Sequence, residues 1–161
     1  MKLFLLIATL SFAGAATALS LEEIEQYRAG AGMGYAKAAE LNQFPGPMHV
    51  LELAEALGLS AEQRAATERL MQAHKAEARA LGVKLVAAEH ALEQLFRSGK
   101  VGDAELAKAV GEAARLQGEY RLSHLETHRR MRALLNEEQV RRYDTLRGYG
   151  SSGTQHQHRK H

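Results

Sequence analysis

The segment HLETH at residues 124–128 contains two histidines four residues apart. On a helix this spacing places His124 and His128 one above the other on the same face, which suits chelation of one metal ion. The segment is not the zinc-protease sequence H-E-x-x-H, because Leu125 occupies the position of the catalytic glutamate. The pattern predicts a metal site without protease chemistry.

Long helices must position these histidines. Apolar periodicity and capping signals predict four helices: residues 48–57 ending at Gly58, Ser60 to about Arg97, a helix capped by Asp103 and running to about Leu134, and residues 137–146 ending before Gly148. The short turn around Gly99 forces the two long helices to lie antiparallel. The sequence therefore predicts an all-α fold, a long antiparallel α-hairpin with two shorter flanking helices.

The packing faces of the two long helices follow from apolar residues three and four apart. The first face contains Met71, His74, Ala78, Leu81, Leu85, Ala88, Leu92 and Leu95. The second contains Leu106, Val110, Ala113, Gln117, Tyr120, His124, Thr127, Met131 and Leu134.

Counting from a turn centred near Gly99 places His124 opposite His74, and His128 opposite Leu70 or Met71. Met71, His74, His124 and His128 could thus form one cluster, whose nitrogen and sulfur donors would suit copper or zinc. The alternative is that each histidine satisfies one hydrogen bond in a partly wet core. No cofactor is required by the sequence, and Zn, Cu or Ni are the candidate ions.

The C-terminal segment offers a second, looser group of metal donors, His156, His158 and His161. Residues 149–161 are rich in Gly, Ser and His, which predicts a disordered tail that could bind Zn²⁺, Cu²⁺ or Ni²⁺ weakly. Met33, Met48 and His49 lie in or beside a Gly/Pro-rich stretch and are interpreted as packing residues or chance occurrences, with metal ligation as a minor alternative.

The N-terminal residues 1–18 have the layout of a secretory signal peptide: Lys2, an apolar run and a small-residue A-x-A site. Cleavage is expected after Ala18, which implies a periplasmic protein. No cysteine is present, so stability must come from packing, caps, metal or oligomerisation. Residues 19–47 are Gly- and Ala-rich and are predicted to be a flexible arm, and residues 48–148 to be the four-helix domain.

Several function classes find no support in the composition. The formal net charge is +2, and loss of Lys2 lowers it to +1, so no strong field favours nucleic acid. There is no Cys nucleophile and no Gly-rich loop between a strand and a helix, and the serines show no His/Asp arrangement. We expect a protein that is not an enzyme.

Two nearly identical five-residue segments lie at the starts of the second and fourth predicted helices. LSAEQ contains Leu59, Ser60 and Gln63, and LNEEQ contains Leu135, Asn136 and Gln139. Each segment is a capping box, in which the Ser or Asn side chain accepts from a backbone N–H of the first turn. The Gln side chain accepts in return from the backbone N–H of the cap residue. The preceding leucine can pack on the new helix as a hydrophobic staple.

The chain resembles the LTxxQ family of periplasmic proteins in these duplicated segments, in their spacing and in the signal peptide. That family includes Spy- and CpxP-type chaperones or stress adaptors and the related ZraP- and CnrX-type metal-resistance proteins. The resemblance covers about residues 47–146, with Ser60 and Asn136 in place of the motif's threonine. It implies a cradle-shaped homodimer that binds unfolded or partly folded polypeptides without ATP, and a membrane sensor protein as a further partner.

A mixed apolar and basic surface on the third helix would suit such binding. Its residues are Arg121, Leu122, Leu125, Arg129 and Arg132. Alternatively, the two leucines lie in the seam of a dimer. We therefore expect a periplasmic ATP-independent chaperone or envelope-stress adaptor that binds non-native polypeptides. The alternative is a periplasmic heavy-metal sensor or metal-binding resistance protein.

Overall fold

The computed structural model describes residues 17–149, which form six helices and no strand. The helices are α1 (Leu21–Ala29), α2 (Lys37–Glu40), α3 (Pro47–Glu52), α4 (Ala61–Arg97), α5 (Asp103–Leu134) and α6 (Glu137–Arg147). The predicted all-α class is confirmed. The predicted signal peptide lies outside the described residues except for its last two.

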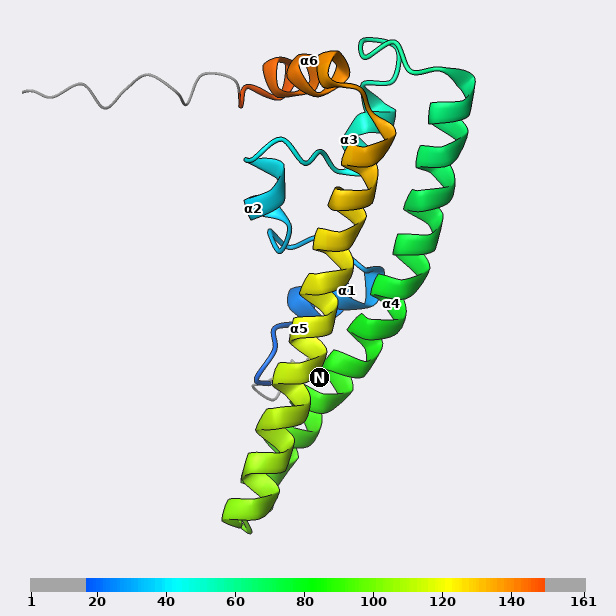
Figure 1. Ribbon diagram of the computed structural model, residues 1–161. Helices are drawn as coiled ribbons and strands as arrows, with labels where there is room; N and C mark the ends of the chain where they lie inside the picture. The colour runs from blue at the N-terminus through cyan, green and yellow to red at the C-terminus, as the bar shows by residue number, and fades with distance from the viewer. Residues whose placement is uncertain (1–16, 150–161) are drawn as a thin grey trace, which may run out of the picture.

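The two long helices α4 and α5 form the predicted antiparallel hairpin (Figure 1). Residues 98–102 connect them, and Gly99 has a φ of 65°, a left-handed conformation that glycine adopts without strain. At the other end of the hairpin, α3 packs against α4 and α5, and α6 runs away from the end of α5. The homodimer stays a prediction.

Two apolar cores stabilise the hairpin. The central core joins α1, α4 and α5 and contains Tyr27, Ala78, Leu85, Val86, Leu116 and Tyr120. The motif-end core joins α3, α5 and α6 and contains Val50, Leu57, Met131, Leu135, Val140 and Tyr143. Between the cores, the hairpin faces the N-terminal loops, and this is where the histidines lie.

The predicted flexible arm at residues 19–47 differs from the structure, which contains α1 and α2 there. Ser20 and Glu23 form a capping box at the start of α1, and Gly30 ends it with a φ of 70°. The buried Tyr27 packs edge-on against Tyr120 at 5.2 Å between ring centroids. Composition suggested an arm because the contacts that hold α1 in place come from residues more than 50 positions away.

Gly82 explains how α1 can lie so close to α4. A Cβ atom at position 82 would lie 1.9 Å from the carbonyl oxygen of Tyr27. Only a residue without a side chain permits this approach of two backbones.

Smaller differences concern the ends and faces of the helices. The first predicted helix, residues 48–57, is α-helical only over α3 and continues as turns to Gly58. Asp103 is not the N-cap of α5, because Gly102 occupies that position without a side-chain bond. Val110 and Gln117 are exposed, and Leu116 is buried in place of Gln117. Tyr149, placed in the tail by sequence, packs against the motif-end core.

Within residues 17–149, none of the helices has the length and hydropathy needed to cross a bilayer.

Candidate functional site: a histidine and methionine pocket beside the paired motifs

Both predicted capping boxes are present. The hydroxyl of Ser60 accepts from the N–H of Gln63 at 3.1 Å, and the side chain of Asn136 accepts from the N–H of Gln139 at 2.8 Å. Each glutamine side chain accepts in return from the backbone N–H of its cap. Leu59 and Leu135 pack into the motif-end core, as expected of hydrophobic staples.

The two motif glutamines also pair with each other, which the sequence analysis did not predict. Gln63 Nε2 donates to Gln139 Oε1, and Gln139 Nε2 donates to Gln63 Oε1, both at 2.9 Å. The second N–H of Gln63 donates to the carbonyl of Leu134 at 2.8 Å, and that of Gln139 reaches the carbonyl of Gly58 at 3.5 Å. Each glutamine amide therefore caps the start of its own helix and also bonds to the segment that precedes the other helix. The repeated motif fixes two helix starts to each other.

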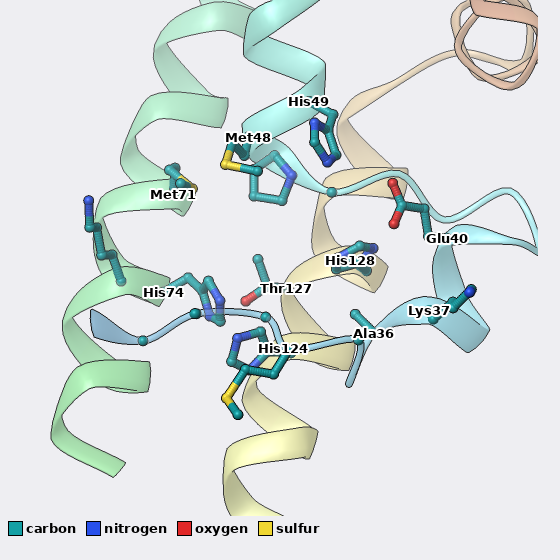
Figure 2. A pocket seen from close by; sticks show the side chains of 18 of the residues that line it. Ala36, Lys37, Glu40, Met48, His49, Met71, His74, His124, Thr127 and His128 are labelled. Atoms are coloured by element: carbon teal, nitrogen blue, oxygen red, sulfur yellow. The ribbon is translucent and has the colours of Figure 1, made fainter. Parts of the chain in front are cut away.

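A pocket of about 640 Å³ opens between the hairpin and the N-terminal loops. Its walls come from the α1–α2 loop, α2, the start of α3, and the facing sides of α4 and α5 (Figure 2). The donor side chains that line it are Met33, Glu40, Met48, His49, Met71, His74, His124 and His128. The structure thus brings the four residues predicted as the hairpin metal cluster into one pocket.

His124 and His74 face each other across the hairpin, as counting from Gly99 predicts. Their ring centroids lie 4.5 Å apart and the ring planes are nearly perpendicular. His124 is 3% exposed, and its Nδ1 lies 2.9 Å from the carbonyl oxygen of Tyr120. Because a carbonyl can only accept, Nδ1 carries the hydrogen and Nε2 keeps its lone pair. Nε2 of His124 and Nδ1 of His74 are both buried without a hydrogen-bond partner.

Two further histidines of the pocket are oriented in the same way. His128 donates its Nδ1–H to the carbonyl of Phe44 at 2.8 Å, and its ring packs where a side chain at Gly46 would lie. The Nδ1 of His49 is 2.7 Å from a carboxylate oxygen of Glu52. Metal-binding histidines commonly donate one ring N–H to an oxygen in this way, which orients the ring and leaves Nε2 for the ion.

The predicted histidines share a pocket but do not converge on one point. Within residues 17–149, no three His, Cys, Asp or Glu side chains are close enough together to hold a single ion. His128 differs from the facing pair because its ring is held against the loop before α3. Any ion bound by His74 and His124 needs a third donor of another type.

Burial favours the neutral form of two pocket imidazoles, those of His74 and His128. It lowers the pKa of His74 to about 4, with further lowering from the neighbouring His124 and His128. Burial also lowers the pKa of His128, although its bond to the Phe44 carbonyl opposes the shift. A neutral imidazole keeps a lone pair on one ring nitrogen, and this is the form that binds metals.

Met33 and Met48 line the pocket together with Met71, although the sequence analysis interpreted the first two as packing residues. Met33 has a φ of 45°, an uncommon left-handed conformation for a residue with a side chain. The run GAGMG around Met33 and the pair Met48-His49 were the available sequence signals. They were uninformative alone because the chain must fold back by more than 70 residues to bring them to His124.

The predicted client-binding residues all lie on α5 and differ in exposure. Leu122 is 55% exposed, whereas Leu125 is half-buried. Arg121 stacks over the ring of Tyr35, and Arg132 pairs with Glu137 and joins the end of α5 to α6. Arg129 is exposed. The tail donors His156, His158 and His161 lie outside the described residues.

Comparisons with known proteins agree with the motif. No curated protein and no solved structure matches the chain. The model of the LTXXQ motif family matches residues 47–147, which span α3 to α6 and both capping boxes. The matched region is more than half of the 161 residues. The chain belongs to the LTXXQ motif family.

Proposed function

We propose that this member of the LTXXQ motif family is a non-enzymatic periplasmic protein of metal resistance, in which the pocket between the hairpin and the N-terminal loops binds a transition-metal ion. Membership in the family is consistent with a role in periplasmic stress or metal resistance. The observation that carries the proposal is the pair of buried, unpartnered ring nitrogens of His74 and His124.

Buried polar atoms almost always have a partner, and each one left without it costs about 1–3 kcal/mol. The two rings line one pocket, and neither nitrogen has a hydrogen-bond partner among residues 17–149. An ion bound between them would satisfy both with one contact each. Burial lowers the pKa of His74, which keeps its imidazole in the metal-binding form.

Thermal unfolding with and without Zn²⁺, Cu²⁺ or Ni²⁺ tests the proposal. An ion at about a hundred times its Kd stabilises the folded state by about 2.7 kcal/mol. We expect the wild type to gain stability, and His74→Gln and His124→Phe to lose most of the gain. His90 is the matched control, because it lies on α4 outside the pocket with a side chain 65% exposed. Its alanine variant should respond like the wild type.

A variant lacking His156, His158 and His161 separates the pocket from the C-terminal histidines. If all stabilisation disappears in this variant, the ion binds the tail and the proposal for the pocket is wrong. If no ion raises the unfolding temperature of either this variant or the wild type, the proposal of metal binding is wrong.

Binding of non-native polypeptides, with the chain acting as an ATP-independent chaperone or stress adaptor, is the second candidate function. It is favoured by large apolar side chains exposed along the hairpin, which are Val83, Phe96, Val110 and Leu122. Their exposed fractions are 54%, 60%, 48% and 55%. The same side chains could instead be covered in a homodimer, and a membrane sensor protein remains a proposed partner.

Suppression of aggregation of an unrelated unfolded protein tests this candidate. We expect near-stoichiometric protection, weakened in Leu122→Ser and retained in Leu146→Ser, since Leu146 is 48% exposed on α6 away from the hairpin face. Sedimentation of the same variants distinguishes the dimer seam, because Leu122→Ser would then produce monomers. No protection by the wild type at any ratio would exclude the chaperone candidate.

A further inference from the structure

We infer that the pocket selects cuprous copper, Cu(I), held by His74, His124 and the thioether of Met71. This inference rests on the proposed function and adds the identity of the ion and its third ligand. It follows from the donors the pocket offers, from those it lacks, and from its charge.

The two nitrogen donors are already oriented. The bond from His124 Nδ1 to the Tyr120 carbonyl directs Nε2 away from the helix backbone, and the His74 ring meets the His124 ring edge-on. The unpartnered atom of His124 belongs to a side chain that is only 3% exposed. Two nitrogens buried in this way suit an ion with few ligands better than one that keeps several waters.

Within the described residues, the pocket does not bring together the ligands of a typical zinc site. Structural zinc sites almost always have four ligands from Cys, His, Asp or Glu, whereas no three of these converge in the described part of the chain. Glu40 is the one carboxylate among the described residues that line the pocket, and it already accepts from the Tyr143 hydroxyl at 3.0 Å. Figure 2 shows Glu40 on the side of the pocket away from His74.

The charge of the pocket argues in the same direction. Arg147 is paired with Glu40 at 3.5 Å, and Lys37 and Lys75 line the pocket, so cations are not offset by a free carboxylate. A monovalent ion bound by neutral ligands carries half the uncompensated charge of a divalent one. Burying an unpaired charge is costly, so the lower charge is favoured.

Sulfur supplies the missing donor. Met71 lies three residues before His74 on α4, which places both on one helix face, and Figure 2 shows the two side chains directed to the same side of the pocket. Met33 and Met48 line the other walls. Thioethers are soft ligands that favour Cu(I), whereas zinc in proteins is bound by Cys, His, Asp and Glu. Three methionines without a free carboxylate therefore favour Cu(I) over Zn²⁺ and Ni²⁺.

Competition with a chromogenic Cu(I) chelator under anaerobic conditions tests the inference. The protein would carry alanine at His156, His158 and His161, so that the tail does not contribute. We expect one Cu(I) per chain, with Zn²⁺ and Ni²⁺ bound more weakly, and sulfur among the ligands by X-ray absorption. Met71→Leu keeps the apolar volume and should weaken Cu(I) binding on the order of tenfold or more.

Met131→Leu is the matched control, because Met131 is fully buried in the motif-end core outside the pocket. Its Cu(I) affinity should equal that of the parent. Equal, His74-dependent binding of Zn²⁺ and Cu(I) would overturn the selectivity and leave the proposed function standing. An unchanged affinity in Met71→Leu, or a loss seen instead in Met33→Leu or Met48→Leu, would overturn the ligand assignment. Binding of no ion at all would refute the proposed function as well.

Discussion

Exchange of Gln63 for glutamate separates two roles of the repeated motif. Glutamate serves a capping box as well as glutamine does, so the helix start at Ser60 would be retained in Gln63→Glu. The exchange removes the amide N–H groups that donate to Gln139 and to the carbonyl of Leu134. If capping were the whole function of the motif, the variant would be as stable as the wild type.

The expected loss follows from the bonds between the glutamines. Two bonds join the side chains of Gln63 and Gln139 at 2.9 Å, and a third joins Gln63 to the Leu134 carbonyl. Gln63→Glu loses the two bonds that the Gln63 amide donates and keeps the one it accepts, so at a net value of about 1 kcal/mol each the free energy of unfolding should fall by about 2 kcal/mol. Because Gln139 is only 6% exposed, water cannot readily replace the missing partner.

A double-mutant cycle with Gln63→Ala and Gln139→Ala measures the pair directly. Gln139→Ala should cost about 3 kcal/mol, since it loses its own box bond and the two shared bonds. Gln63→Ala should cost about 4 kcal/mol, since it loses the same kinds of bond and also the bond to the Leu134 carbonyl. The double variant should cost about 2 kcal/mol less than the sum, because the shared bonds are lost only once. Urea denaturation with linear extrapolation provides the values.

Gln72→Ala is the control, since Gln72 is exposed on α4 and should change stability by no more than about 0.5 kcal/mol. A coupling energy below about 0.5 kcal/mol, or a Gln63→Glu variant as stable as the wild type, would refute the paired arrangement.

Three further predictions concern the N-terminal segment. Gly82→Ala should destabilise the protein by about 3 kcal/mol, because the new Cβ would collide with the Tyr27 carbonyl, whereas Gly118→Ala has open space and should stabilise it by up to about 1 kcal/mol in denaturant titrations. Tyr120→Phe should cost about 1–2 kcal/mol and speed amide exchange in the α1–α2 loop, because its hydroxyl donates to a loop carbonyl at 2.6 Å. Hydrogen bonds from the N-cap serine lower the pKa of Glu23. The charged Glu23 therefore stabilises the fold above the ordinary carboxyl pKa, and this stabilisation is lost as the pH falls through the lower pKa of the folded state. In Glu23→Gln, the free energy of unfolding should fall less steeply with decreasing pH in acid titrations.

The helix starts and the hairpin were readable from sequence because their signals are local. Ser60 and Asn136 stand three residues before their glutamines, and the turn at Gly99 sets the register. That register alone places His74 opposite His124, since each lies 25 residues from Gly99. Counting along two helices is reliable when the connection is as short as residues 98–102.

The docking of α1 and the pairing of the glutamines were not readable in the same way. The capping box of Ser20 and Glu23 was visible in the sequence, but a nine-residue helix is marginal without packing. Its packing depends on Gly82, whose missing side chain has no signature in a helical pattern. The glutamine pair likewise depends on two helix starts that lie close together in the fold. The spacing of residues within one segment does not predict this proximity.

The hairpin is held unevenly along its length. The motif glutamines clamp one end, whereas no residue between Ala87 and Glu112 is buried. The free energy of local opening should therefore fall steadily from the clamp toward the turn, and fraying should begin there without unfolding the rest. The turn end is therefore the end that separates most readily, and it already exposes Phe96 and Val110. Local opening at this end would enlarge the exposed apolar surface.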